Sequence, residues 1–106
     1  MTNIISCLCI FLFAFSSTLQ NQEPDFTKEQ DLKMLGAGKI IQKDNSIFNN
    51  IHLLKVNEYW ITYEKNSSSH DMTMDVISRI EFPASKYGSL FIKFPNNKPE
   101  AHTLNY

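Results

Sequence analysis

Cysteine is scarce in this 106-residue chain, and both copies, Cys7 and Cys9, lie inside the apolar run from Ile4 to Phe15. Small exported domains often rely on disulfides because their hydrophobic cores are small. If the segment that contains both cysteines is removed, no disulfide can form. The folded part must then be held together by packing alone, and association with a second copy would support it.

The same apolar run lacks the length of a membrane span, because a helix needs about 20 apolar residues to cross a bilayer. It is followed by the small polar residues Ser16, Ser17 and Thr18, which is typical of a cleaved signal peptide. The sequence predicts a signal peptide over residues 1–20, a secreted or periplasmic protein, and no transmembrane segment in the mature chain. Since Met1 to Asn3 carry no lysine or arginine, a retained N-terminal helix is the alternative.

An excess of charge of either sign is also missing. The chain has ten basic and eleven acidic residues, a formal net charge of -1, whereas a protein that binds nucleic acid needs a basic face for the phosphates. We therefore expect no nucleic-acid partner. Eight phenylalanines, four tyrosines and one tryptophan supply large apolar side chains for a core. Residues 21–106 are predicted to form a single small β-rich domain.

Only three glycines occur, and two of them follow the single clear helix signal. Thr27 is predicted to cap the helix together with Gln30, three residues further on. The predicted helix covers residues 28–35. Gly36 and Gly38 are both expected to allow a left-handed exit from its C-terminus, because glycine adopts positive φ at little cost.

After the helix, apolar and polar residues alternate in short segments that are separated by turn residues, which is typical of an antiparallel sheet. The predicted fold is mainly β: a small antiparallel meander sheet, roll or partly closed barrel of about five to six strands, with one short N-terminal helix. The expected strands are 39–43, 51–56, 59–65, 70–74, 78–82 and 89–94, with a weak edge strand possible at 100–106.

The order of these segments invites one comparison. A helix, then Gly38 and Asp44, then residues 51–54, a short strand and residues 76–80 resembles the order of elements in Sm-like RNA-binding barrels, over about half of the chain. The resemblance implies a small barrel. Because the charge is balanced and an export signal is predicted, it does not imply RNA binding.

The strongest predicted strand, residues 59–65, carries the binding hypothesis. Trp60, Thr62 and Glu64 share one face of this strand, and Tyr59, Ile61 and Tyr63 share the other. We expect the second face to enter the core. Trp60 is expected to pack under the helix or a loop; the alternative, on which the binding hypothesis depends, is that it is half exposed and available to a partner or a sugar ring. The predicted binding residues are Trp60, Thr62, Glu64, Tyr59 and Tyr63.

Evidence for catalysis is thin. The three histidines show no metal-ligand spacing, and we predict no catalytic residue, no metal and no cofactor. His70, Asp71 and Asp75 are weak metal candidates, but adjacent residues of a strand face opposite sides, so His70 and Asp71 would not chelate one ion. A small metal-dependent hydrolase is therefore the least favoured function.

The sequence thus predicts an exported binding or protein-interaction module that uses an exposed aromatic sheet face, with an unidentified protein or envelope component as its partner. The alternative is a self-assembling envelope structural protein, a homo-oligomer in which an unprotected strand such as Ser89 to Phe94 pairs with another copy. A polar turn at Asn66, Ser67 and Ser68 would also accept a glycan in a eukaryotic host.

Overall fold

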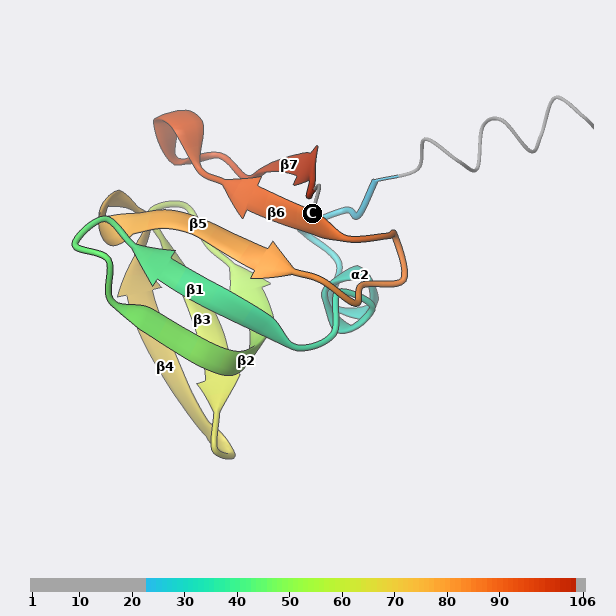
Figure 1. Ribbon diagram of the computed structural model, residues 1–106, viewed down its shortest axis with the longest axis horizontal. Helices are drawn as coiled ribbons and strands as arrows, with labels where there is room; N and C mark the ends of the chain where they lie inside the picture. Colours follow the sequence, from blue (N-terminus) through green and yellow to red (C-terminus); the bar gives the residue numbers. More distant parts are fainter. Residues whose placement is uncertain (1–22, 105–106) are drawn as a thin grey trace, which may run out of the picture.

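The computed structural model describes residues 23–104 and is mainly β (Figure 1). One short helix, α2 (Glu29–Lys33), precedes seven antiparallel strands, which form one sheet in the order β4-β3-β2-β1-β5-β6-β7. The predicted fold class is confirmed. The sheet is open, because within residues 23–104 its outer strands β4 and β7 each pair with one neighbour only. No helix in this part of the chain is long and apolar enough to cross a membrane.

The element bounds follow the predicted segments closely, and the weak edge strand expected near the C-terminus is present, which brings the strands to seven where five to six were predicted. The strands are β1 (Gly38–Gln42), β2 (Ile47–Val56), β3 (Trp60–Lys65), β4 (Ser68–Thr73), β5 (Ile77–Phe82), β6 (Leu90–Lys93) and β7 (Glu100–Thr103). Two 3-10 turns, η1 (Met74–Val76) and η2 (Pro95–Asn97), follow β4 and β6. Because the sheet of the described residues is open, the small barrel that the resemblance to Sm-like proteins implied is not formed.

Strand β2 belongs to both halves of the sheet. Its first half pairs with β1, up to Ile51 opposite Gly38, and its second half pairs with β3, from His52 opposite Glu64 onward. Asn50 lies just before the change of partner at a φ of 55°, a conformation that asparagine tolerates better than most residues. β3 and β4 consequently run steeply below and behind β1 and β5 (Figure 1).

The core lies on the inner side of this bent sheet. Ile40 of β1, Ile80 of β5 and Ile92 of β6 stand opposite one another in register and are fully buried. The other buried apolar side chains come from the helix region, from β2 to β6 and from η1: Leu32, Leu35, Ile51, Leu53, Ile61, Tyr63, Met72, Met74, Ile77, Phe82 and Leu90. Strand alternation therefore places one apolar face inward, as predicted.

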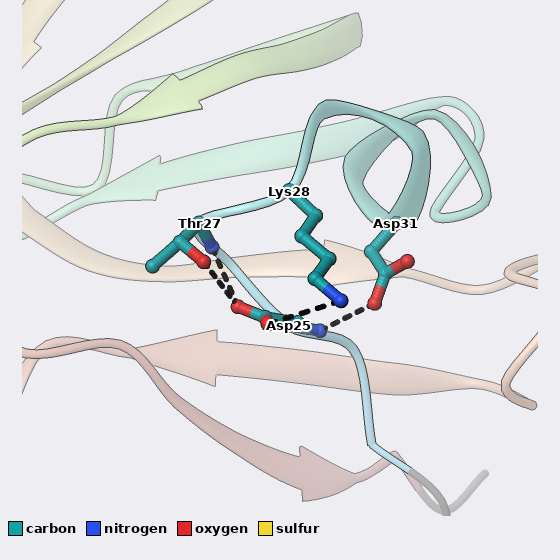
Figure 2. Close-up of polar contacts among 4 residues, drawn as sticks. All are labelled: Asp25, Thr27, Lys28 and Asp31. Carbon is teal, nitrogen blue, oxygen red and sulfur yellow. Dashed lines mark hydrogen bonds and ion pairs between the residues drawn. The ribbon is translucent and has the colours of Figure 1, made fainter.

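The N-terminus of the helix differs from the sequence prediction. The residue that caps α2 is Lys28, and no side chain caps it. Thr27 instead donates both its backbone N–H (3.0 Å) and its hydroxyl (2.6 Å) to Oδ1 of Asp25, and the Asp25 N–H donates to Asp31 (2.7 Å; Figure 2). These hydrogen bonds to Thr27 hold the pKa of Asp25 below its ordinary value. The Thr27–Gln30 cap was wrong because a local aspartate turn competes for the same hydroxyl.

The two glycines after the helix have different roles. Gly36 has a φ of 74°, which confirms the predicted left-handed exit. Gly38 does not: it begins β1, and a Cβ at this position would lie 2.5 Å from Cε1 and 2.7 Å from Cδ1 of Phe82. The predicted role of Gly38 was wrong. Glycine is needed at this position because a side chain would clash with the buried Phe82 ring, and not because the backbone has a positive φ.

The position of the segment from Ser89 to Phe94 differs from the self-assembly alternative, in which this segment was an unprotected strand. The segment from Ser89 to Phe94 contains β6, which pairs with β5 on one side and with β7 on the other. Its backbone hydrogen bonds are therefore used inside the sheet, and it cannot pair with another copy. The edges of the described sheet are β4 and β7.

Candidate functional site

The candidate site is the outer face of β3, with its neighbours β2 and β4. Ile61 and Tyr63 are buried, whereas Trp60 is 40% exposed and Thr62 and Glu64 are half-buried. The alternation that was read from the sequence therefore separates these residues correctly. We call this outer surface the Trp60 face and define it by Trp60, Thr62 and Glu64 with their cross-strand neighbours His52, Lys55, Ser69, Asp71 and Thr73.

A row of polar groups crosses the Trp60 face beside the indole. Thr62 stands opposite Lys55 of β2 and opposite Asp71 of β4. Nδ2 of Asn57 donates to the Thr62 hydroxyl (3.4 Å), and that hydroxyl donates to Oδ1 of Asp71 (2.7 Å). Thr62 therefore links Asn57 of the β2–β3 turn to one oxygen of the exposed Asp71 carboxylate of β4.

Exposed apolar side chains gather at one end of the Trp60 face. Tyr59 is 56% exposed and lies in the β2–β3 turn, which the N–H of Asn57 closes by donating to the Trp60 carbonyl (2.9 Å). The N–H of Met74 donates to the Tyr59 carbonyl (2.9 Å), so η1 and its exposed Val76 lie at the same end. With Leu54, the extra residue of a β2 bulge, this region holds four of the six exposed large hydrophobic side chains of the described residues.

Tyr63 lies on the opposite side of β3 from Trp60. It is 6% exposed, its ring stacks on His70 with the centroids 5.4 Å apart, and burial raises its pKa. Of the five predicted binding residues, Trp60, Thr62, Glu64 and Tyr59 are therefore accessible on or beside the Trp60 face. Tyr63 supports that face from within the core.

Asp71 was predicted only as a weak metal candidate, and strand-by-strand reasoning missed its place on the Trp60 face. A signal was present, since asparagine tolerates the positive φ that a two-residue hairpin turn requires, and such a turn at Asn66 and Ser67 pairs Lys65 with Ser68. Counting back along both strands from that pair puts Thr62 opposite Asp71, as the structure does.

The weak metal candidates are not gathered into a site. The His70 ring lies on the inner side of β4 against Tyr63, Asp71 lies on the outer side, and Asp75 follows in η1. Between residues 23 and 104 no group of three histidine, cysteine, aspartate or glutamate side chains could hold a metal ion.

Two open hollows lie away from the Trp60 face. One, of about 400 Å³, is bordered by Pro24, Tyr87 and His102, and the other, of about 420 Å³, lies between η1 and η2 and is bordered by Lys43, Ile77 and Phe94. Neither is bordered by Trp60, Thr62 or Asp71. A third hollow, of about 250 Å³ and also open, lies at the Glu64 end of the Trp60 face, where His52 and Ser67 border it. Because no enclosed cavity lies beside Trp60, the candidate site is an open sheet surface that suits a large partner better than a small enclosed ligand.

A second charged surface covers the outer side of β5 and β6. Arg79 pairs with Glu81 at 2.6 Å, Lys39 lies 3.9 Å from the same carboxylate, and Arg79 also lies over the ring of Phe91 at 5.4 Å. Phe91 stacks on His102 with the rings 5.1 Å apart. The Glu81 carboxylate thus has two cationic partners, whereas Nε of Arg79 is buried without a hydrogen-bond partner among the described residues.

No protein-family model matches this chain, and no significant match was found among the curated proteins or the solved structures. Function must therefore be argued from the geometry of the chain itself.

Proposed function

We propose that this chain is an exported binding module that recognises a protein or envelope component through the Trp60 face. The observation that carries the proposal is the 40% exposure of Trp60 on the outer side of β3, next to an ordered row of hydrogen-bonding groups. Tryptophan is the residue most often found at the energetic centre of protein interfaces, because it buries a large apolar area with little loss of conformational entropy.

The surroundings of Trp60 resemble those of an interface centre. Tyr59, Leu54 and Val76 add exposed apolar area, while Lys55, Glu64 and Asp71 form a border that carries both signs of charge. Apolar anchors surrounded by polar groups are the usual anatomy of a protein–protein interface. The ordered Thr62–Asp71 hydrogen bond adds a fixed acceptor, which favours one orientation of the partner.

Replacing Trp60 with alanine is expected to weaken binding of the partner by about 30-fold, because truncation of an interface centre typically costs about 2 kcal/mol or more. The mature chain is immobilised and exposed to proteins of the culture fluid and envelope of its host. A captured component is then purified, and its Kd is measured by calorimetry for both forms.

The matched control is Ile47→Ala, because Ile47 is a large apolar side chain that is 52% exposed at the far end of β2. It should leave the Kd within about twofold. Equal Kd values for the wild type and Trp60→Ala would place the binding surface elsewhere and overturn the proposal.

Export makes a separate prediction. The protein recovered from its host should begin between Ser17 and Asn21, at the end of the predicted signal peptide, and should be found in the culture fluid or the envelope. Intact mass and N-terminal sequencing of each fraction provide the measurement. A chain that begins at Met1 and stays in the cytosol would refute export.

A further inference from the structure

The two edges of the sheet differ in how well they are protected. β7 (Glu100–Thr103) is short and directly follows Pro99, both features that discourage further strand pairing. β4 (Ser68–Thr73) contains no proline and no lysine, and its register with β3 is unbroken by any bulge. Within the described residues nothing pairs with its outer side. β4 is therefore the unprotected edge.

The backbone hydrogen bonds between β3 and β4 show which N–H and C=O groups of β4 are free. Asn66 and Ser67 both have positive φ, 55° and 67°, as in the type I′ turn of a two-residue hairpin, so the closing pair Lys65 and Ser68 is hydrogen-bonded. The hydrogen bond from the Met74 N–H to the Tyr59 carbonyl shows that the pair Tyr59 and Met74, an even number of residues further along the ladder, is hydrogen-bonded too. Since bonded and non-bonded pairs alternate in antiparallel ladders, Ser69, Asp71 and Thr73 direct their N–H and C=O groups away from β3.

Asp71 adds a directed acceptor at this edge. Its Oδ1 accepts the hydrogen bond from Thr62, and Oδ2 forms none with the described residues. The carboxylate is thereby oriented with one oxygen free, on the same face as the hydroxyls of Ser69 and Thr73. The edge presents donors and an acceptor that match a second copy of itself.

We propose that β4 pairs antiparallel with β4 of a second copy, about a twofold axis perpendicular to the sheet. In an antiparallel ladder, residues with free backbone groups must stand opposite one another, which leaves three central registers. Asp71 opposite Asp71 of the partner subunit would place like charges side by side, which is destabilising. Thr73 opposite Asp71 of the partner subunit would let only residues 71–73 of each β4 pair with the other copy.

The remaining register puts Ser69 opposite Asp71 of the partner subunit and keeps residues 68–72 of β4 paired. The Ser69 hydroxyl then faces the free carboxylate oxygen of the other copy, twice by symmetry. Both outer faces end on the same side of one continuous sheet, so the dimer presents two Trp60 faces side by side. Such an arrangement would bind a repetitive partner with avidity, although pairing itself does not depend on the proposed function.

The test is the mass of the mature chain in solution over a range of protein concentrations, measured by sedimentation velocity. The wild type should form a concentration-dependent dimer. Ser69→Pro removes an outward N–H without removing a β3–β4 hydrogen bond, and it should raise the dimer Kd at least tenfold. Ser69→Ala keeps that N–H and loses only the hydroxyl, so it should raise the Kd about two- to tenfold. Circular dichroism establishes that each variant is folded.

A monomer at every concentration, or a dimer with the same Kd in folded Ser69→Pro, overturns the proposal. If Ser69→Pro does not fold, hydrogen exchange of the wild type decides: the amides of residues 69, 71 and 73 should be protected when the protein is concentrated and exchange rapidly after dilution. Unchanged exchange at these amides rejects the β4 pairing. Trp60→Ala should dimerise like the wild type, which separates this inference from the proposed binding function.

Discussion

Replacing Phe82 with alanine is expected to lower the free energy of unfolding by about 3 to 5 kcal/mol, the usual loss for a large aromatic ring that is removed from a core. Phe82 is fully buried at the end of β5, opposite Leu90, and a cavity would remain against β1. Small domains are stable by only about 5 to 15 kcal/mol, so this variant should be close to unfolding. Urea titration followed by circular dichroism measures the effect.

Phe91→Ala is the matched control, because it makes the same chemical change on the neighbouring strand. Phe91 lies on the outer side of β6, where it contacts Arg79 and stacks on His102. Its removal leaves no enclosed cavity, and the loss should stay below about 1.5 kcal/mol. Equal losses for the two variants would contradict the assignment of the inner face of β5 to the core.

Gly38→Ala is expected to lower the free energy of unfolding by about 1 to 3 kcal/mol, the range typical of an overpacked core. A Cβ at position 38 would lie 2.5 Å from the Phe82 ring and 3.0 Å from the Glu81 carbonyl oxygen. The ring cannot retreat because it is fully buried in a close-packed core. Chemical denaturation of the single variant provides the value.

Whether the clash with the Phe82 ring causes the loss of stability in Gly38→Ala is tested in a Phe82→Leu background. Because leucine is smaller than the ring, Gly38→Ala should be less destabilising there, by about 1 kcal/mol or more, which is a typical coupling between residues in contact. Gly36→Ala is the control: Gly36 has a φ of 74° and 3.8 Å of clearance, so its loss comes from backbone strain and should not depend on residue 82. Additive losses for Gly38→Ala and Phe82→Leu would contradict the contact.

Alternation was sufficient to predict the fold class and the two sides of β3. Trp60 and Ile61 are adjacent in sequence, yet one is 40% exposed and the other fully buried, because successive strand residues point to opposite faces. The early start of β2 was not predicted. Asn49 and Asn50 look like turn residues, but they continue the strand through a local bend with Asn50 at positive φ.

What could not be predicted depended on contacts between distant segments. Gly38 resembles any glycine after a helix until β5 brings Phe82 beside it. Glu81 alternates as a surface residue, yet it is 8% exposed because Arg79 and Lys39 surround its carboxylate. The β3 residues of the Trp60 face could be predicted from the alternation within one strand. The Thr62–Asp71 hydrogen bond could be predicted only from the register between β3 and β4. Propensity identified the strands, whereas strand pairing determined which residues meet.

The most direct test of the Trp60 face uses the single tryptophan of the chain. Binding of the purified partner should shift the Trp60 fluorescence to shorter wavelength and protect it from quenching by acrylamide, because the indole leaves water for an apolar contact. A partner that binds with the same affinity by calorimetry, but leaves both the emission and the quenching of Trp60 unchanged, would contradict the proposed binding surface.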